Sequence, residues 1–142
     1  MLVVDEATSQ RMAPIGHRTS WPEAAVRSAV YRAGLRFRTR NGDLPGSPDL
    51  ANRRSGWAVF VHGCFWHRHR GCAKSGVPRR NRAYWLDKLA RNEARDRRAL
   101  LALRRLGFDV RVVWQCELAS PTRRARVLDR LVSGLKAARA RT

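Results

Sequence analysis

The sequence predicts an α/β domain in which helices cover a mixed central sheet. Apolar runs of strand length alternate with segments of helical periodicity, an order typical of this fold class. The chain has 142 residues, 44% of them hydrophobic, which is enough to form the core of one domain. We find no repeat, low-complexity tract or linker in it. We therefore expect an N-terminal arm over residues 1–20 and a single domain over residues 21–142.

The first part of the chain predicts one helix and one strand. A helix should begin after Ser20, because Pro22 and Glu23 suit a first helical turn, and it should stop at Gly34. Apolar residues alternate with arginines over residues 35–39, which predicts a half-solvated strand. The Asn-Gly-Asp sequence that follows predicts a turn.

The middle of the chain predicts a short strand, a central strand and a long loop. The proline-rich run Leu44–Asp49 leads into a strand near Leu50. The continuous apolar run Trp57–Val61 is typical of a central strand. Residues 63–80 have no clean period, yet they hold two of the three cysteines and two of the four histidines. We interpret this segment as a functional loop.

The second half predicts a helix, a strand and a final helix. The long helix should span Arg82–Leu106 and end at Gly107. The run Phe108–Trp114 predicts a strand, in which we expect Trp114 to face the core. Helical spacing of apolar residues predicts the last helix over Arg124–Ala138.

The charge of the chain points to a polyanionic partner. Lys and Arg number 30 against 11 Asp and Glu, so the formal net charge is +19. Nucleic acid or an acidic membrane surface would match it, although a compositionally biased genome could also produce many arginines. No apolar run approaches the roughly 20 residues of a membrane span. We expect a cytoplasmic, nucleoid-associated protein of bacterial type, without a membrane partner and monomeric.

The cysteines suggest a metal site rather than a disulfide framework, because their number is odd. Cys64, His69 and Cys72 lie in one loop, and Cys116 follows the next predicted strand. Three thiolates and one imidazole suit a closed tetrahedral zinc site that would pin this loop. The alternative is three buried, unpaired cysteines and a surface histidine.

Asp96 lies where the long helix should present an apolar stripe. It is seven residues after Leu89 and seven before Leu103, and the predicted stripe also includes Leu86, Leu100 and Leu106. A buried carboxylate is costly without a partner, so we expect a protonated histidine or a metal ion from another element. The alternative is that Asp96 lies at the edge of the stripe and forms a salt bridge with a core-facing arginine.

Asp49 is a second carboxylate of interest. Pairing of its strand with the central strand would bring it close to the backbone of Val61. A carboxylate and a backbone carbonyl can hold Mg²⁺, although an Asp after Pro is commonly a turn former. Glu23 has a plain explanation as a residue that matches the helix dipole.

Two histidines are left over if His69 binds zinc. His67 and His62 would then lie near the same loop, where an imidazole beside a metal-bound water could act as a general base. The alternative is a pair of solvated loop histidines.

Three aromatic residues stand in or beside basic sequence. Phe65 and Trp66 are adjacent in the loop, and Trp85 follows a run of arginines. Exposed aromatics in such a setting suit base stacking or wedging into DNA, although Trp66 or Trp85 could instead pack beneath the loop.

Several strings in this order resemble the very short patch repair (Vsr) endonuclease family, over roughly residues 9–118. The strings are Phe60-Val-His-Gly-Cys-Phe-Trp-His-Arg-His-Arg-Gly-Cys72, Leu44-Pro-Gly-Ser-Pro-Asp49, Tyr84-Trp-Leu-Asp-Lys88, Asn92-Glu-Ala-Arg-Asp-Arg97 and Val112-Val-Trp-Gln-Cys116. The family is a divergent branch of the PD-(D/E)xK endonuclease fold, whose members nick DNA 5′ to the T of a T:G mismatch that arises from 5-methylcytosine deamination.

The resemblance implies a role for each candidate residue. Asp49 and the main-chain carbonyl of Val61 would bind Mg²⁺, and His67, oriented by Asp96, would activate water, with His62 and Glu23 beside them. Zinc would be structural, held by Cys64, His69, Cys72 and Cys116. The side chains that wedge into the duplex would be Phe65, Trp66 and Trp85 from the major groove, with Met12 of the DNA-contacting arm near the minor groove.

The chain departs from the ordinary nuclease pattern at one place. Phe60-Val61-His62 stands where an acidic-x-Lys element is usual, so Asp49 is the one clear carboxylate ligand and the number of catalytic metals stays open. The implied partner is double-stranded DNA with a T:G mismatch, and mismatch-repair proteins are candidate partners. A zinc-stabilised DNA-binding module and a structural RNA-binding protein are the alternatives; neither gives Asp49 and Asp96 a role.

Overall fold

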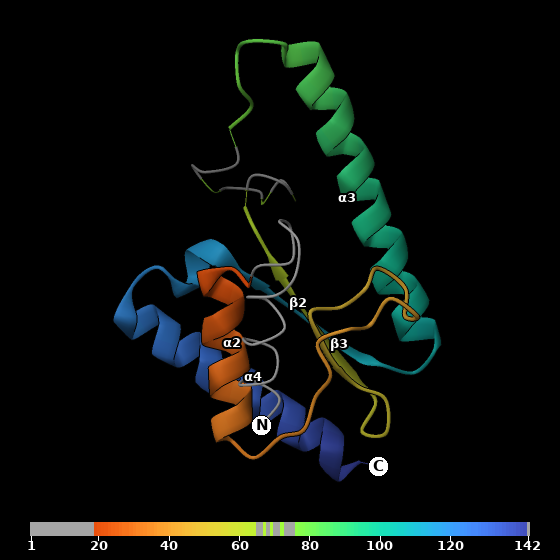
Figure 1. Ribbon diagram of the computed structural model, residues 1–142, viewed down its shortest axis with the longest axis vertical. Coiled ribbons are helices and arrows are strands. Elements are labelled where there is room, and N and C mark those ends of the chain that lie inside the picture. The colour runs from red at the N-terminus through yellow and green to blue at the C-terminus, as the bar shows by residue number, and fades with distance from the viewer. Residues whose placement is uncertain (1–18, 65–66, 68, 70–71, 73–75, 142) are drawn as a thin grey trace, which may run out of the picture.

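The computed structural model describes residues 19–64, 67, 69, 72 and 76–141 (Figure 1). The expected wedge residues Phe65 and Trp66, and Met12 with the rest of residues 1–18, lie outside this range. The described elements, in order, are α2 (Trp21–Arg32), β1 (Leu50–Asn52), β2 (Trp57–His62), α3 (Arg82–Arg105), β3 (Asp109–Trp114), the 3-10 helix η2 (Gln115–Leu118) and α4 (Pro121–Ala140).

The described strands form one sheet in the order β1-β2-β3, and it is mixed, as the sequence predicts. β1 runs antiparallel to β2, with Leu50 opposite Val59. β3 runs parallel to β2, with Val113 opposite Val61. β2 is therefore the central strand, and the connection from it to β3 passes through the loop and α3.

The predicted strand over residues 35–39 is wrong. The segment makes only an isolated bridge between Arg38 and Ala51. Next to the bridge, the side-chain amide of Asn52 donates to Arg36 O at 2.9 Å and so takes the place of a backbone donor there. β1 is also only three residues long, so it offers few partners.

The two faces of the sheet pack against different helices, as Figure 1 shows. Trp57 and Val59 face α2 and α4 in the larger core, which includes Val30 and Leu135. Alternate residues of β2 face the other way, where Phe60 joins a smaller core with Leu103 of α3. This alternation fixes which side chains at the end of β2 lie near α3.

The helix ends follow capping signals in the sequence. Ser20 caps α2 and Ser120 caps α4, each with its hydroxyl accepting a backbone N–H of the first turn. Because Pro121 suits a first helical turn, α4 begins three residues before the predicted Arg124. Within the described ranges, no helix combines the length and the apolar character needed to cross a membrane.

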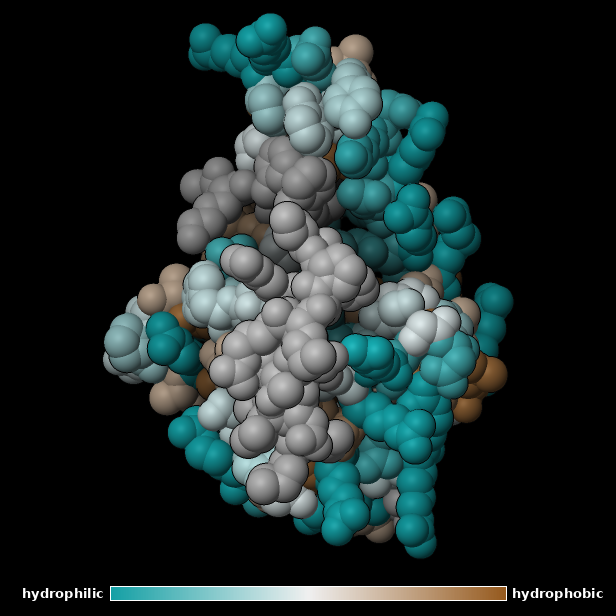
Figure 2. Space-filling view, viewed as in Figure 1, coloured by the Kyte–Doolittle hydropathy of each residue, from teal (hydrophilic) through white to brown (hydrophobic). Residues whose placement is uncertain are grey.

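The leucine stripe of α3 is only partly buried, which corrects the prediction. Leu89 and Leu103 are buried, whereas the side chains of Leu86 and Leu106 are exposed. The amino-terminal part of α3 extends past the sheet in Figure 1, so Leu86 has no sheet to cover there. Figure 2 shows that the outer side of α3 is hydrophilic.

Candidate functional site

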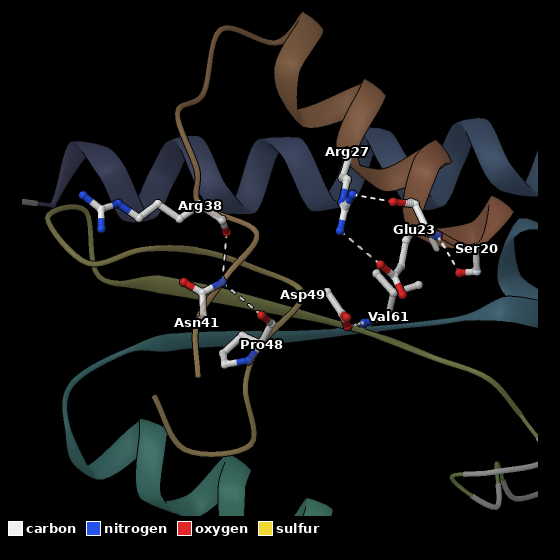
Figure 3. Close-up of polar contacts among 9 residues, drawn as sticks. Ser20, Glu23, Arg27, Arg38, Asn41, Pro48, Asp49 and Val61 are labelled. Atoms are coloured by element: carbon white, nitrogen blue, oxygen red, sulfur yellow. Dashed lines mark hydrogen bonds and ion pairs between the residues drawn. The ribbon is translucent and has the colours of Figure 1, made fainter. Parts of the chain in front are cut away.

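The loop before β1 holds Asp49 against the edge of β2. The side-chain amide of Asn41 donates to the carbonyls of Arg38 and Pro48, at 2.9 and 3.0 Å, and so closes this loop (Figure 3). The backbone N–H of Asp49 then donates to Val59 O at 3.0 Å. Its carboxylate accepts the N–H of Val61 at 2.7 Å. The carboxylate therefore takes the place of the next backbone acceptor along the strand edge.

The surroundings of Asp49 disfavour its charged form. Burial raises the pKa of this carboxyl from 3.8 to about 7, and the nearby carboxylate of Glu23 adds to the increase. The N–H of Val61 and the guanidinium of Arg27 lower this pKa, but their combined effect is smaller than the increase. The surroundings of Asp49 therefore provide too little positive charge to keep its carboxylate ionised, and a bound divalent cation would supply that charge.

Arg27 and Glu23 reach this site from α2. Figure 3 shows both side chains above Asp49 and Val61. Arg27 is buried and donates to Glu23 at 3.2 Å and to the hydroxyl of Thr19 at 2.7 Å. Arg27 was not among the site residues predicted from the sequence. The feature that could have identified Arg27 is its spacing of four residues from Glu23, because this spacing places the two side chains on one face of the helix.

Asp96 binds a residue of another element, as its place on α3 predicts. Its carboxylate oxygen Oδ2 lies 2.5 Å from Nδ1 of His67. This is a charge-assisted hydrogen bond, and it is too short to leave room for a metal ion between the two atoms. With Nδ1 bound to the carboxylate, the lone pair at Nε2 of the neutral ring is available to accept a proton.

His62 lies flat against His67. The two ring centroids are 3.8 Å apart and the ring planes differ by 6°. His62 is buried, and burial, followed by the charge of His67, lowers its pKa to about 4. Its Nδ1 has no hydrogen-bond partner among the described residues. The ring is therefore neutral near pH 7 and has an unused polar atom at the site.

Asp49 and the two histidines gather at the carboxyl end of β2. Asp49 binds the backbone of Val61, His62 is the next residue, and His67 stacks on His62. The side chain of Val61 packs on the α2–α4 face, whereas Phe60 faces α3 and stands 5.6 Å from the ring of His62. The carboxylate at the strand edge thus adjoins an imidazole pair on the α3 face.

Four predicted zinc ligands form a compact cluster. The donor atoms of Cys64, His69, Cys72 and Cys116 all lie within 4.8 Å of one another. The sulfur of Cys116 is 3.3 Å from Nδ1 of His69, and that of Cys64 is 3.7 Å from the same atom. Tetrahedral ligands at Zn–S bonds of about 2.3 Å are about 3.8 Å apart, so the donor set fits zinc.

The thiols of this cluster crowd one another. Burial, followed by the neighbouring thiols of Cys64 and Cys72, raises the pKa of Cys116 to about 12. Without a cation, the Cys116 sulfur would stay protonated, whereas zinc would bind it as a thiolate. The backbone is already tied together here, because His69 N–H donates to Cys64 O at 3.0 Å.

Trp114 belongs to this site and not to the core, which corrects the prediction. It is partly exposed at the end of β3 and stacks on His69, with centroids 4.2 Å apart. Its edge meets His62 at 5.1 Å. A single indole therefore contacts both the cysteine cluster and the histidine pair. No sequence feature indicated this position, because a tryptophan in a strand is usually a core residue.

Trp85 lies in the first turn of α3, away from the sheet. It is partly buried and meets Tyr84 edge to face at 5.3 Å. The ammonium of Lys88 lies 5.8 Å from each ring centroid. These side chains form an aromatic and basic cluster at the end of α3 that extends beyond the sheet.

Comparisons with known proteins give one consistent result. Residues 3–74 match the family model described as DNA mismatch endonuclease Vsr. The chain is 44% identical over 108 residues to the type II nicking enzyme V.XorIIP of Xanthomonas oryzae pv. oryzae, which covers 76% of this chain and 79% of that protein. It is 37% identical over 132 residues to the type II nicking enzyme V.NmeAIP of Neisseria meningitidis, covering 91% and 94%. It is 39% identical over 117 residues to the DNA mismatch endonuclease Vsr of Escherichia coli K12, covering 82% and 74%.

Proposed function

The chain belongs to the Vsr family of DNA mismatch endonucleases, and we propose that it nicks DNA 5′ to the T of a T:G mismatch in a Mg²⁺-dependent reaction. The mismatch would be the product of 5-methylcytosine deamination. The observation that supports this reaction best is at the end of β2, where Asp49 binds the N–H of Val61 and the next residue, His62, stacks on His67, which is hydrogen-bonded to Asp96.

Asp49 and the main-chain carbonyl of Val61 would hold Mg²⁺. Burial raises the pKa of the Asp49 carboxyl to about 7, so a nearby cation is needed to keep it ionised at neutral pH. This need for positive charge supports the assignment. When bound, Mg²⁺ supplies positive charge at the scissile phosphate and makes water more acidic. Glu23, placed by Arg27 beside Asp49, would orient water or the ion from the α2 side.

His67 would be the general base. Asp96 holds its Nδ1, so Nε2 would accept the proton of the attacking water, and the carboxylate would stabilise the imidazolium that forms. His62 would stay neutral, because its pKa is lowered to about 4, and it could donate a hydrogen bond to a phosphate oxygen. The stacked rings keep the general base from rotating.

Structural zinc would hold the base in place. His67 lies between the ligands Cys64 and His69 in the chain, so a cation on the four donors would fix both sides of it. Cys116 would join the loop to the end of β3, next to Trp114. This is a positioning role, without contact between zinc and substrate.

The fold would be a divergent PD-(D/E)xK nuclease. The mixed sheet and the position of Asp49 at the edge of the central strand support this proposal. The chain lacks the usual lysine, because Phe60-Val61-His62 takes the place of the acidic-x-Lys element. The histidine pair at the end of β2 would supply the base instead.

Mismatch selectivity would depend on deforming the duplex. The aromatic cluster around Trp85 would wedge into the major groove together with Phe65 and Trp66, and Met12 of the arm would approach from the minor groove. A T:G pair is weaker than a matched pair, so wedging beside it would cost less. Mismatch-repair proteins would then be candidate partners at the nicked product.

The test is a nicking assay on labelled duplexes of one sequence that carry T:G, T:A or C:G at the same position. We expect Mg²⁺-dependent cleavage of one strand of the T:G duplex only, and loss of cleavage in Asp49→Ala and His67→Ala. Asp129→Asn, a change at an exposed residue of α4, is the matched control and should cut normally. Equal cleavage of the three duplexes would overturn the selectivity, and full activity of Asp49→Ala would overturn the metal assignment.

A further inference from the structure

A basic groove lies at the end of the molecule opposite the catalytic residues. Two adjoining cavities of about 600 and 480 Å³ share Arg36, Asn52 and Arg54 in their walls. Arg139 completes the first cavity, and Arg38 and Arg53 complete the second. We call the surface formed by Arg36, Arg38, Arg53, Arg54 and Arg139 the arginine groove.

The groove is far from the proposed catalytic centre. Asn52 pairs with Trp57 at the start of β2, whereas His62 ends that strand. Five residue steps of strand separate Trp57 from His62, which is about 17 Å. Figure 2 shows hydrophilic side chains gathered at this end of the molecule, toward the C-terminus marked in Figure 1.

The backbone that carries the groove is fixed by hydrogen bonds. The amide of Asn52 donates to Arg36 O at 2.9 Å, and its side-chain oxygen accepts the N–H of Ser55 at 2.9 Å. Ser55 is buried, and Arg38 is tied to Ala51 by a bridge. The guanidinium groups therefore project from an ordered scaffold and not from a free loop.

Arg36 and Arg54 give the groove positive charge that no ion pair among the described residues compensates. Within the same ranges, neither cavity is lined by a carboxylate. Arg53 binds Asp43 and Asn41, and Arg38 also interacts electrostatically with Asp43. Within the described part of the chain, Arg36 and Arg54 form no hydrogen bond or ion pair with an acidic side chain. Asp109, which starts β3 at this end of the sheet, is already bound by Arg111 and Arg141. Like charges held together in this way create a strong attraction for anions.

We propose that the arginine groove binds the phosphate backbone of a DNA segment other than the one at the catalytic centre. Arginine forks suit phosphate oxygens, and a row of them suits repeated phosphates better than a single small anion. The one aromatic residue of the lining, Phe37, is buried, so the groove presents no surface for stacking bases. Binding would therefore be independent of sequence and of the mismatch.

Two sources could supply this second segment: a distant stretch of the same DNA molecule or a separate duplex. The experiment uses the full chain, without Mg²⁺ so that no strand is cut, and a bead-bound duplex with a T:G mismatch. Capture of a second, fluorescent duplex without a mismatch is then measured. Capture identifies a separate duplex as a source, whereas affinity that rises with duplex length, without capture, identifies the same molecule.

The test variant is Arg36→Gln/Arg38→Gln/Arg54→Gln, and the matched control is Arg123→Gln/Arg126→Gln/Arg130→Gln on the exposed side of α4. Each variant removes three positive charges. We expect the groove variant to lower binding of the second segment at least tenfold and to reduce the salt slope of that binding by about two to three. The control should change the binding less than threefold.

Four further results complete the test. The groove variant should nick a short T:G duplex at the normal rate, and its melting temperature should not fall, because the change removes repulsion. Binding of a single duplex segment by the unchanged protein would overturn the proposal. Equal weakening by the groove and control variants would also overturn it, because net charge alone would then explain the binding.

Discussion

The carboxylate of Asp96 lies 2.5 Å from Nδ1 of His67, although 29 positions separate the two residues in the chain. Asp96 comes from the middle of α3 and His67 from the loop after β2. The contact determines which imidazole nitrogen is available for chemistry, because Nδ1 is engaged and Nε2 is not. The ring of His62 stacks on one face of the His67 imidazole and helps to hold it in this orientation.

Replacing Asp96 by Asn should slow nicking by about 10²- to 10⁴-fold, because the amide can favour the wrong tautomer of His67. Protein stability should change little. Single-turnover nicking rates of the variant and of the unchanged protein give the measurement. His67→Ala and the double variant Asp96→Asn/His67→Ala should nick at about the same slow rate. Additive losses of rate would contradict a shared function of the two residues.

Replacing Asp49 by Asn should stabilise the metal-free protein above neutral pH. The pKa of the folded carboxyl is about 7, above its usual value of 3.8, so the folded state holds a proton that the unfolded state has lost. The free energy of unfolding therefore falls as pH rises from about 4 to about 7. At pH 8 the free energy of unfolding of the variant should exceed that of the unchanged protein by at most about 4 kcal/mol.

Thermal unfolding at pH 5 and pH 8 measures this effect, with Asp43→Asn as the control. Asp43 is exposed and the Arg53 guanidinium lowers its pKa, so its replacement should not stabilise the protein. Added Mg²⁺ should raise the melting temperature of the unchanged protein but not that of Asp49→Asn. If Asp49→Asn were less stable than the unchanged protein at both pH values, the prediction that ionised Asp49 destabilises the metal-free protein would be wrong.

The purified protein should carry about one zinc ion per chain, and its removal by a strong chelator should lower both the melting temperature and the nicking rate. Cys116→Ser should have the same effect, because a serine hydroxyl is a poor zinc ligand. Metal analysis of the desalted protein gives the first measurement. Asp96→Asn is the control, which should keep its zinc because Asp96 is not among the four donors.

Gly46→Ala should destabilise the protein more than Gly34→Ala. Both glycines have positive φ, at +73° and +79°, so both substitutions cost about 1 kcal/mol of backbone strain. At Gly46, however, the added Cβ would stand 2.5 Å from Cβ of Ala99 and 3.2 Å from the ring of Phe60, whereas nothing lies within 4 Å at Gly34. The overpacking adds about 1–3 kcal/mol.

Urea unfolding of the two glycine variants compares their stabilities, and the nicking rate gives a second readout. Gly46 lies three residues before Asp49, so a shift of its loop should also slow catalysis, whereas Gly34→Ala should nick normally. Equal losses of stability in the two variants would show that backbone strain alone matters.

Asp109→Asn should destabilise the protein by about 1 kcal/mol at neutral pH, because Asp109 bonds to Arg111 at 2.7 Å and to Arg141 at 2.9 Å. Hydrogen bonds from Arg111, the largest favourable cause, lower the pKa of this carboxyl. The stabilisation is therefore complete above its unfolded pKa and is lost as pH falls through the lower folded pKa. Chemical unfolding at pH 7 and pH 3 measures it, and Asp129→Asn should have no comparable effect.

Local sequence signals predict the regular elements well where the backbone itself carries them. Serine caps begin α2 and α4, Gly34 follows the end of α2, and the apolar run Trp57–Val61 identifies the central strand. The same reasoning failed at residues 35–39, where alternation is present but β1 offers too short a partner. Pairing of strands depends on a second segment, which periodicity in the first cannot show.

The candidate site was predictable as a set of residue types but not as an arrangement. The donor set of the cysteine cluster and the odd position of Asp96 were visible in the sequence. The place of Trp114 was not, because a strand residue faces the core or a site according to what packs at the strand end. The same limit applies to Arg27, whose burial depends on how α2 meets the sheet.

The sequence by itself determined the helices and strands, the strong positive charge and the kinds of side chain available for chemistry, because these follow from local backbone geometry and composition. Only the tertiary structure decided that Asp96 meets His67, that Asp49 binds the edge of β2, and that arginines from distant segments line one groove. The reason is physical: burial, pKa and the distance between remote residues are properties of packed elements, and no single segment possesses them before it packs.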